Sequence, residues 1–411
     1  MRKDCMHIGL MGPVDNDDIR DLVGCELDCL PRTNQGAGLV ASIAKEYVAA
    51  GHRVTLFTCT SHLRVGDRPV LHRQGQFSIY YIPARGRAFG FEQGRWGRML
   101  DFFKIEREGL LFSIEDADPD ILHAHWAYEY GMAALNSGKP YLITCHDDPL
   151  AVLRSDFGLY RLGRFFMASS VIKRAEHLSA VSMYLVHALG VYASVPISLV
   201  PNPIPEYVFD DYRRDKIGPN NAPAMVMILS DWGKLKNPKP AMRAAKIVRS
   251  NFPGAKMHLI GNGFGLGGPA HQFARENGIE DHFVYHGRLT NREAIAILAS
   301  ADVMVHPSLE ESFGMTIAES MIVGVPIVAG RDSGAVPLML KGGAYGTLVD
   351  VRDPDQISAA ITSVLCDHHK SQMAVDSARA WARSEFHPKS VAMKYESILM
   401  SICEMTSRMA S

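Results

Sequence analysis

The sequence lacks a long hydrophobic run, an excess of charge of either sign and a regular arrangement of cysteines. Because no stretch of about 18 apolar residues occurs, no membrane-spanning helix is predicted. With 43 Lys and Arg against 44 Asp and Glu, the net charge of −1 leaves no basic footprint of the kind that binds phosphate backbones. We therefore expect no nucleic-acid partner.

The 7 cysteines are scattered and odd in number, which argues against a disulfide framework. Cys25 and Cys29 are close in sequence, but no second Cys or His pair with zinc spacing accompanies them, so we expect free thiols and no metal site. The start, Met1–Asp4, is followed by no apolar signal segment, which predicts that the chain is not secreted. The expected location is a reducing cytoplasm.

Short apolar runs alternate with helix-length amphipathic stretches along the 411 residues, which suggest two domains. Examples are Ile8–Met11, Val54–Phe57, Ala224–Leu229 and Val303–Val305. Continuous apolar runs indicate strands buried on both faces, and helices between them imply parallel, doubly wound α/β sheets. Because ligands of such sheets bind beyond the carboxyl ends of the strands, the residues after each run are candidates for function.

The polar, proline-marked segment 202–224 separates one α/β series from the next. It predicts a first Rossmann-like domain over residues 1–205 and a second over residues 206–388. The remaining stretch, 389–411, is predicted to be an amphipathic helix that must bury its apolar stripe. The residues that recur in it at helical spacing are Val391, Tyr395, Ile398, Leu399 and Ile402.

The most informative string follows the apolar run Val303–Val305 and reads HPSLEESFGMTIAE. A helix is predicted to begin after its Phe-Gly pair, so that Glu311 stands at a strand-to-helix junction and Glu319 further along the helix. Free N–H groups at the helix start, Gly314–Thr316, form an anion site suited to a diphosphate. Carboxylates beside sugar or ribose hydroxyls accept charge-assisted hydrogen bonds. The alternative is that Glu311 caps the helix and Glu319 is a solvated surface residue.

This string resembles the signature of family 4 of the retaining glycosyltransferases, whose GT-B architecture is two Rossmann-like domains of doubly wound parallel sheets facing across a cleft. The counterparts of its Glu-x7-Glu element are Glu311 and Glu319, and Gly324–Val328 matches a later Gly-x-Pro-Val-Val element. The resemblance implies that Glu311 faces the donor sugar and Glu319 the donor ribose. Further donor-binding residues implied by the same element are Phe313, Gly314, Met315 and Thr316.

The segment Asn34–Gly38 resembles the N-terminal glycine loop of the same family, with Gln35 in place of one glycine. The resemblance assigns Gly36 to donor binding, because a glycine lets the backbone approach a phosphate closely. A plain turn is the alternative.

Two histidine-bearing segments of the first half also resemble the family. Asp120–Trp126 is similar to its Asp-x-x-His-x-His segment and places His125 and Trp126 on the acceptor side, in an acceptor-binding first domain. His146, at the end of a later strand-like run, matches a histidine that in the family contacts the donor sugar near the reacting carbon. Without that match, a histidine at a strand end reads as structural.

In the second half, Leu235–Pro238 resembles the family's Lys-Gly element, in which the lysine neutralises the donor phosphates. The resemblance implies that role for Lys236. The family usually has an arginine five positions earlier, where Asp231 stands here. Lys234 is the candidate replacement, although a lysine is a point charge without the bidentate fork of arginine.

The base-binding loop of the family is matched by His286–Leu289, which assigns Arg288 and Leu289 to donor binding. Ser333-Gly334 matches a later glycine element, although Leu338 replaces the glutamate common there. The resembling elements therefore extend over nearly the whole chain, and in the family the last helix packs back on the first domain.

The resemblance implies a hexosyltransferase that breaks the C1–O bond of a nucleotide-diphosphate sugar and forms the new bond on the same face. Lys236 and the helix start can neutralise the leaving diphosphate, and no Asp-x-Asp element stands where a divalent ion would assist. We therefore predict metal independence and no cofactor. Glu311, His146 and Lys236 are the expected catalytic residues. The expected acceptor is a carbohydrate or a lipid-linked molecule, in cell-surface polysaccharide or glycolipid synthesis.

Three other functions stay open. A nicotinamide dehydrogenase is disfavoured, because Gly9–Pro13 has the wrong glycine spacing and Phe57–Cys59 lacks an acidic ribose ligand. A GT-B sugar-nucleotide epimerase or phosphorylase would share most of the elements above. A catalytically silent sugar-nucleotide-binding subunit is kept open by Asp231.

Two segments of the first domain are rich in arginine and aromatic residues. Arg85–Arg107 holds six basic and three acidic residues, and Arg154–Arg174 five basic and one acidic. Aromatic side chains interleaved with arginine suit an anionic lipid surface, which predicts peripheral contact with the inner face of a membrane. The alternative is a pair of ordinary helices with buried apolar faces.

Overall fold

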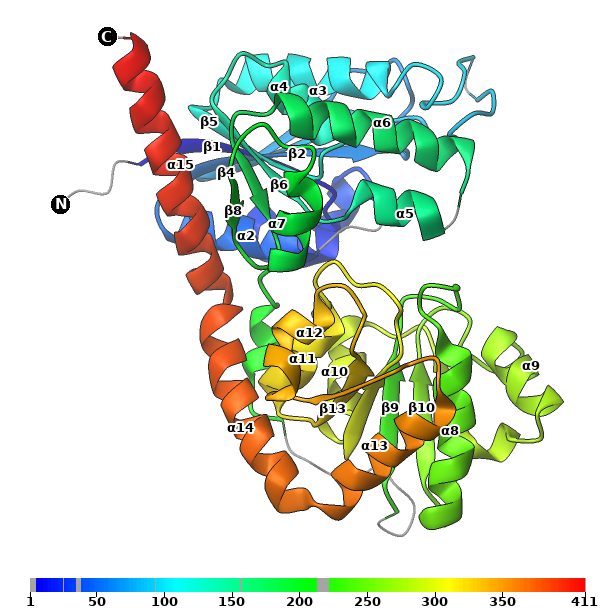
Figure 1. The fold of residues 1–411 in the computed structure, drawn as a ribbon. Coiled ribbons are helices and arrows are strands. Elements are labelled where there is room, and N and C mark those ends of the chain that lie inside the picture. The colour runs from blue at the N-terminus through cyan, green and yellow to red at the C-terminus, as the bar shows by residue number, and fades with distance from the viewer. Residues whose placement is uncertain are drawn as a thin grey trace. The chain divides into compact units, whose positions relative to one another are not determined.

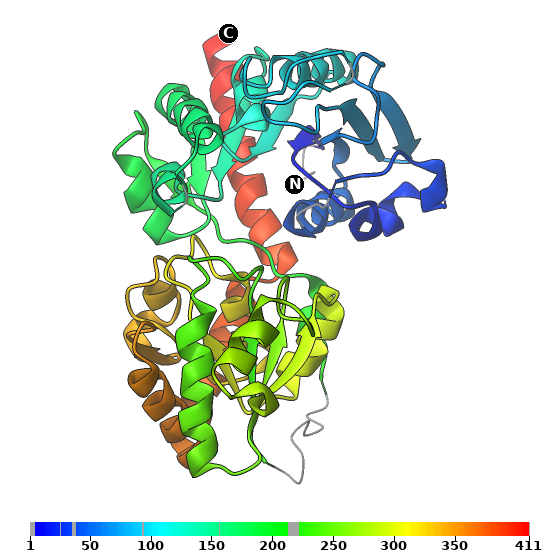
Figure 2. The same ribbon diagram turned by 90° about the vertical axis from the view of Figure 1, so that its right-hand side faces the viewer.

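The structure, a computed structural model, divides into two compact units (Figures 1 and 2). Unit 1 comprises Met1–Pro205 with Pro388–Ser411, and unit 2 comprises Glu206–His387. The residues that the structure describes are 5–24, 26–34, 38–92, 94–155, 157–212 and 222–410. The residues outside this set are 1–4, 25, 35–37, 93, 156, 213–221 and 411, among them Cys25, Gln35 and Gly36.

Unit 1 is built on an eight-stranded sheet with the order β3-β4-β2-β1-β5-β6-β7-β8. All neighbouring strands are parallel except the edge pair β3 and β4, which is antiparallel. The central strands β1 and β5 are buried at every residue, as inner strands of a sheet covered on both faces are. The strands are β1 (His7–Met11), β2 (Arg53–Thr60), β3 (Val70–Gln74), β4 (Phe77–Pro83), β5 (Ile121–His125), β6 (Tyr141–Cys145), β7 (Leu178–Ala180) and β8 (Ile197–Leu199).

Helices cover both faces of this sheet. α3 packs beside α4 and α4 beside α6 on one face, and α2 packs with α15 on the other (Figure 1). The helices of unit 1 are α1 (Arg20–Val23), α2 (Gly38–Ala49), α3 (Lys104–Ala117), α4 (Glu129–Leu135), α5 (Pro149–Ser155), α6 (Leu159–Arg174), α7 (Met183–Gly190) and α15 (Pro388–Ala410), with short 3-10 turns at Asn16–Ile19 and Leu27–Cys29.

Unit 2 has a six-stranded parallel sheet with the order β11-β10-β9-β12-β13-β14. Its strands are β9 (Ala224–Ile228), β10 (Lys256–Ile260), β11 (Phe283–Gly287), β12 (Val303–His306), β13 (Ile327–Gly330) and β14 (Thr347–Val349). Its helices are α8 (Pro238–Asn251), α9 (Pro269–Glu276), α10 (Asn291–Ala299), α11 (Met315–Val323), α12 (Val336–Met339), α13 (Pro354–Cys366) and α14 (His368–Glu385), with 3-10 turns at Glu206–Phe209, Glu280–His282 and Lys341–Gly343.

The predicted α/β class with two doubly wound, mainly parallel sheets is confirmed. In unit 2, α8 packs beside α13, whereas α10 and α14 pack against α11. None of the helices in the described part of the chain combines the length and the apolar character that crossing a bilayer requires. The six cysteines of the described residues are free thiols, and Cys25 lies outside that set.

The helix α15 joins the core of unit 1 although its sequence follows unit 2. Tyr395 and Leu399 are fully buried among residues of α2 and the central strands, and α15 lies against β5 and β6 (Figures 1 and 2). Beside them, His52 Nε2 and Glu396 Oε1 are 2.9 Å apart and both side chains are buried. The amphipathic stripe of the sequence therefore corresponds to the buried face of this helix.

Shortening Leu399 to alanine should lower the free energy of unfolding of the chain by about 2–5 kcal/mol, because a buried cavity replaces the side chain. Met393 lies on the exposed face of the same helix, with 56% of its surface accessible, so Met393→Ala should stay within about 0.5 kcal/mol of the wild type. Chemical denaturation followed by circular dichroism measures both. Equal losses would contradict the docking of α15 described here.

Candidate functional site

The junction between β12 and α11 gathers most of the predicted donor-binding residues. β12 is buried throughout and ends at His306, and α11 begins at Met315 after Gly314. Gly314 has a φ of 95°, a left-handed conformation that glycine adopts without the steric penalty of a Cβ. Gly324 ends the helix in a second left-handed conformation, as helix C-termini commonly do. The first N–H groups of α11, at Met315 and Thr316, therefore face out of the helix at this junction.

Glu311 is held by two cationic or proton-donating side chains. Lys236 Nζ lies 2.6 Å and His306 Nε2 lies 3.2 Å from Glu311 Oε1. His306 is buried, and its other ring nitrogen, Nδ1, lies 3.3 Å from Thr316 Oγ1 in the first turn of α11. His306 thus links the carboxylate to the helix start. The sequence reasoning missed this residue.

Burial raises the pKa of the Glu311 carboxyl, but the hydrogen bond and charge of His306 and the charge of Lys236 outweigh burial and hold the pKa at about 2. The carboxylate is therefore ionised throughout the physiological range. An ionised carboxylate only accepts hydrogen bonds, so Nε2 of His306 carries the proton between them.

The turn that carries Lys236 is locked to the β12–α11 loop. Leu309 N donates to the carbonyl of Leu235 over 2.7 Å. The Asn237 amide donates to the carbonyls of Pro307 and Val351, over 3.1 and 2.9 Å. These bonds bring Lys236 to Glu311 across 75 positions of sequence.

A glycine loop supports Glu311 from behind. Ala335 N donates to the Glu311 carbonyl over 2.8 Å, and Ser333 Oγ donates to the carbonyl of Ser308 over 2.5 Å. Gly334 has a φ of +60°, and a Cβ there would lie 2.4 Å from the Glu311 carbonyl oxygen. Only a glycine allows this approach without displacing the carboxylate loop.

Asp231, which stands where the family has an arginine, stabilises the same turn. Its carboxylate accepts a hydrogen bond from Gly233 N over 2.6 Å and another from Ser230 Oγ over 2.8 Å. Lys234 is exposed at the tip of this turn. The acidic residue thus has a structural role in placing the backbone that leads to Lys236.

Glu319 lies inside the helix layer rather than on a solvated face. Its side chain is buried, and Oε1 accepts a hydrogen bond of 3.0 Å from the Asn291 amide at the start of α10. Burial raises the pKa of Glu319, and the bond from Asn291 opposes that rise. Since Arg288 and Leu289 directly precede α10, the bond ties the predicted base loop to α11. Asn291 is a second residue that the sequence reasoning missed.

The ring of Phe313 does not face the junction. It is buried and packs edge-on against Phe386, with ring centroids 5.4 Å apart. Any donor contact at this position therefore comes from its backbone.

In unit 1, the structure brings His125, Trp126 and His146 together at the carboxyl ends of β5 and β6. His125 Nδ1 and His146 Nε2 are 2.8 Å apart, and the Trp126 and His146 ring centroids are 4.4 Å apart. Trp126 has a φ of +69°, a conformation that costs a non-glycine residue roughly 1–2 kcal/mol. The backbone N–H of Trp126 donates to the carbonyl of Thr144, and this bond holds the strained turn in place.

Both histidines are neutral. Burial lowers the pKa of His125 well below its ordinary value and that of His146 to about 3, although the Asn202 side chain opposes the shift at His146. The buried atom His125 Nε2 has no hydrogen-bond partner among the described residues. An unpaired polar atom is uncommon in a protein interior, and at a strand end it favours a ligand contact.

Of the remaining predicted residues, Gly36 lies outside the described set, so its position is not part of this geometry. Within the described set, no group of three or more His, Cys, Asp or Glu is arranged to hold a metal ion.

Comparison with known proteins gives two family matches. The family described as Glycosyltransferase Family 4 matches residues 37–206, and the family described as Glycosyl transferases group 1 matches residues 210–381. Along the chain, N-acetyl-alpha-D-glucosaminyl L-malate synthase from Bacillus anthracis is 26% identical over 402 residues, which are 92% of this chain and 96% of that protein.

Two solved structures share the fold. Sucrose-phosphate synthase from Thermosynechococcus elongatus has a TM-score of 0.75 at 17% identity, covering 97% of this chain and 99% of its own. HepE from Anabaena, solved with UDP and glucose, has a TM-score of 0.66 at 16% identity, covering 96% and 100%. The likeness shows the GT-B fold that the sequence predicted.

Adding a methyl group at Gly334 should destabilise the chain more than adding one at Gly342. The two glycines have similar φ values, +60° and +64°, but a Cβ at Gly342 meets nothing within 4 Å. Gly342→Ala should therefore lower the free energy of unfolding only by the cost of a left-handed backbone, about 1–2 kcal/mol. Gly334→Ala should lower the free energy of unfolding by more than this, because the loop that carries Glu311 must also move. Urea denaturation measures both, and equal losses would disprove the supporting role of Gly334.

Proposed function

The chain belongs to family 4 of the glycosyltransferases, and we propose that it transfers a sugar, with retention of anomeric configuration, from a nucleoside-diphosphate sugar to a carbohydrate or lipid-linked acceptor. The observation that carries the proposal is the cluster of Lys236, Glu311 and His306 at the start of α11. It combines the two groups that such a reaction needs, a cation for the leaving diphosphate and an ionised acceptor for sugar hydroxyls.

Lys236 and the start of α11 are proposed to bind the diphosphate. The ammonium group lies at the same junction as the outward-facing N–H groups of Met315 and Thr316, and helix N-termini favour anions. In this proposal the diphosphate takes over Lys236 from Glu311. Positive charge placed where the leaving group gains negative charge supports the proposed metal independence.

Glu311 is proposed to hold the donor sugar. With its pKa at about 2, the carboxylate stays ionised and accepts hydrogen bonds from sugar hydroxyls. His306 keeps it oriented when Lys236 turns to the phosphates. Glu319 is proposed to receive the ribose hydroxyls and Arg288 and Leu289 the base, with the Asn291 bond setting their spacing.

His146 is proposed to contact the transferred sugar, and His125 and Trp126 to act on the acceptor side. A neutral imidazole can donate or accept a hydrogen bond without opposing the positive charge that develops on the sugar. The indole of Trp126, next to it, offers an apolar face suited to a sugar ring.

The proposed chemical step keeps the donor configuration. The bond between C1 and the leaving phosphate oxygen breaks while the acceptor oxygen bonds to C1 from the same face. The acceptor hydroxyl proton passes to the leaving phosphate, so no protein nucleophile or base is required. Each proposed contact acts on charge that grows in the transition state, which is where stabilisation raises the rate.

A catalytically silent sugar-nucleotide-binding subunit is the second candidate, because Asp231 replaces an expected arginine. The turn role of Asp231 weakens that candidate by giving the residue a structural function. An epimerase of the same fold would release the free nucleotide without forming a glycoside. A phosphorylase of the same fold would instead form a sugar phosphate.

The purified chain, incubated with UDP-, GDP- and ADP-sugars and a panel of carbohydrate and lipid-linked acceptors, should form a glycoside from one donor class. Proton NMR of the new anomeric signal should show the configuration of the donor, and EDTA should leave the rate unchanged. An inverted product or loss of the rate in EDTA would contradict the corresponding part of the proposal.

Two variants separate the machinery from the surface. Glu311→Gln and Lys236→Gln should each lower kcat/KM by about 100-fold or more, the usual effect of removing one preorganised electrostatic group. Lys239→Gln, on the exposed start of α8, is the matched control and should leave kcat/KM unchanged. Donor turnover that survives in both site variants would overturn the assignment.

A further inference from the structure

Unit 1 carries a structured loop between β4 and α3, here called the aromatic hairpin (residues 86–99). Its two arms are joined by backbone hydrogen bonds from Arg98 N to the Arg87 carbonyl, 3.0 Å, and from Met99 N to the Ala88 carbonyl, 2.9 Å. Near the tip, Glu92 and Arg95 exchange bonds of 2.9 and 3.0 Å. The described residues of this segment therefore form a defined hairpin.

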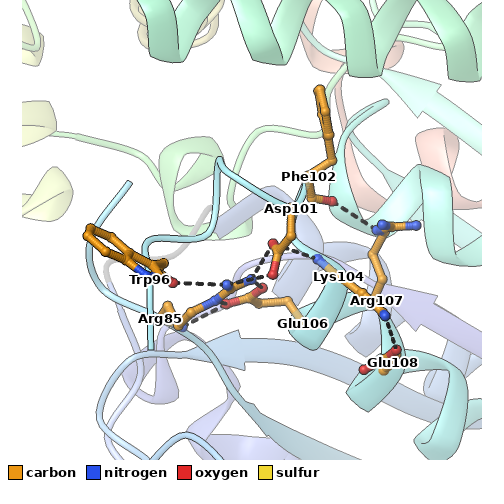
Figure 3. Close-up of polar contacts among 8 residues, drawn as sticks. All are labelled: Arg85, Trp96, Asp101, Phe102, Lys104, Glu106, Arg107 and Glu108. Carbon is orange, nitrogen blue, oxygen red and sulfur yellow. Dashed lines mark hydrogen bonds and ion pairs between the residues drawn. The ribbon is translucent and has the colours of Figure 1, made fainter. Parts of the chain in front are cut away.

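The base of the hairpin is fixed by a buried arginine, as Figure 3 shows. Arg85 donates to both carboxylate oxygens of Glu106, over 3.0 and 2.7 Å, and to both of Asp101, over 2.8 and 2.7 Å. A further bond of 3.1 Å runs from Arg85 to the Trp96 carbonyl. Since Arg85 and Glu106 are almost fully buried, this network anchors the hairpin through its backbone and leaves its aromatic rings outside.

The rings of the hairpin face solvent. Phe91 is 56% and Trp96 63% exposed, and their rings contact edge to face with centroids 5.5 Å apart. The hairpin is held in place by Arg85 and not by burial of these two rings. An exposed aromatic pair on an anchored loop is typical of a surface that docks on something else.

The exposed apolar surface continues onto α6. Met99, at the end of the hairpin, packs over Gly163, where a Cβ would lie 2.6 Å from the Met99 methyl carbon. The same helix exposes Leu159 at 72% and Phe166 at 57%. Two elements far apart in sequence thus contribute to neighbouring apolar surface.

The charge around the hairpin is positive. Arg85 is buried and paired with Asp101 and Glu106, which leaves Arg87, Arg95 and Arg98 against Glu92 in the rest of residues 85–103. Arg87 and Arg95 are exposed on the hairpin itself. The segment around α6, residues 154–174, adds the exposed Arg154, Lys173 and Arg174, whereas Arg164 lies over the ring of Tyr128. A protein partner with an apolar face would not require this charge, whereas anionic lipid headgroups match it.

We propose that the aromatic hairpin docks unit 1 on a lipid bilayer that contains anionic lipid, with Phe91 and Trp96 in the interfacial layer and Arg87 and Arg95 against the headgroups. Tryptophan suits this layer because its ring is apolar and its N–H is polar. The docking is independent of the proposed sugar transfer.

The test is co-sedimentation of the full chain with two kinds of vesicle at low ionic strength. One contains phosphatidylcholine alone and the other an equimolar mixture of phosphatidylcholine and phosphatidylglycerol. The wild type should bind the mixed vesicles and release from them at high salt. The double variant F91S/W96S should bind the mixed vesicles at least about tenfold more weakly than the wild type, because it loses the apolar side chains that insert into the bilayer. R87Q/R95Q should lose the preference for the anionic lipid.

The matched control is L266S/M373S, which changes two exposed apolar side chains of unit 2, 76% and 64% accessible, and should bind as the wild type does. Trp96→Phe should keep binding but lose the blue shift of tryptophan fluorescence that vesicles cause in the wild type. This readout separates insertion of the hairpin from a general loss of folding.

Three outcomes would overturn the proposal. The first is a wild type that does not sediment with the anionic vesicles at low salt. The second is F91S/W96S binding as tightly as the wild type. The third is a wild-type dimer in light scattering that F91S/W96S converts to a monomer, which would make the hairpin an interface between copies of the chain.

Discussion

The ionised carboxylate of Glu311, largely buried at a strand-to-helix junction with 14% of its side chain exposed, is the constraint around which unit 2 is arranged. Burying a charge is unfavourable unless cations and hydrogen-bond donors face it. Lys236 and His306 supply them, and each needs its own support. The Asn237 amide locks the lysine turn, and the carboxylate loop closes on Gly334. The proposed donor site is thereby held in place by contacts within unit 2 itself.

The side chains at the strand ends of unit 1 differ in charge from those of unit 2. There His125 and His146 are neutral because both are buried, and their orientation comes from a strained Trp126 backbone and from the contact between the two histidines. Hydrogen-bonding groups without charge are suited to orienting hydroxyls. The two units thus offer different chemistry. Unit 2 provides charged groups, and unit 1 provides neutral groups that can orient hydroxyls.

Much of the fold was predictable because buried parallel strands leave continuous apolar runs, and each run named from the sequence overlaps a strand, with Ala224–Leu229 extending one residue beyond β9. The strands that had no such run are β3, β7, β8 and β14. β3 is a largely exposed antiparallel edge and the others span only three residues each, so none needs a long apolar segment. The Glu311 string was equally legible, because its glycine, helix start and carboxylates are local.

What the sequence could not provide was contact between distant segments. That Lys236 pairs with Glu311 depends on the Asn237 bonds, and that Asn291 meets Glu319 depends on how α10 packs beside α11. His306 had a usable signal, since it ends a buried strand where apolar residues are expected. Asp231 had another, because an acidic residue two positions before a glycine is typical of a turn. The roles of the site residues themselves stay predictions that ligand binding must test.

The most direct measurement of the central claim is thermal unfolding of the full chain with UDP, GDP and ADP, without metal. If the junction of β12 and α11 is a nucleotide-sugar site, one of these should raise the unfolding midpoint, and at one hundred times its dissociation constant it should add about 2.7 kcal/mol of stability. If a well-folded sample shows no shift with any of the three, or a shift only when a divalent metal is added, the account of Lys236 and Glu311 as a metal-free donor site is wrong.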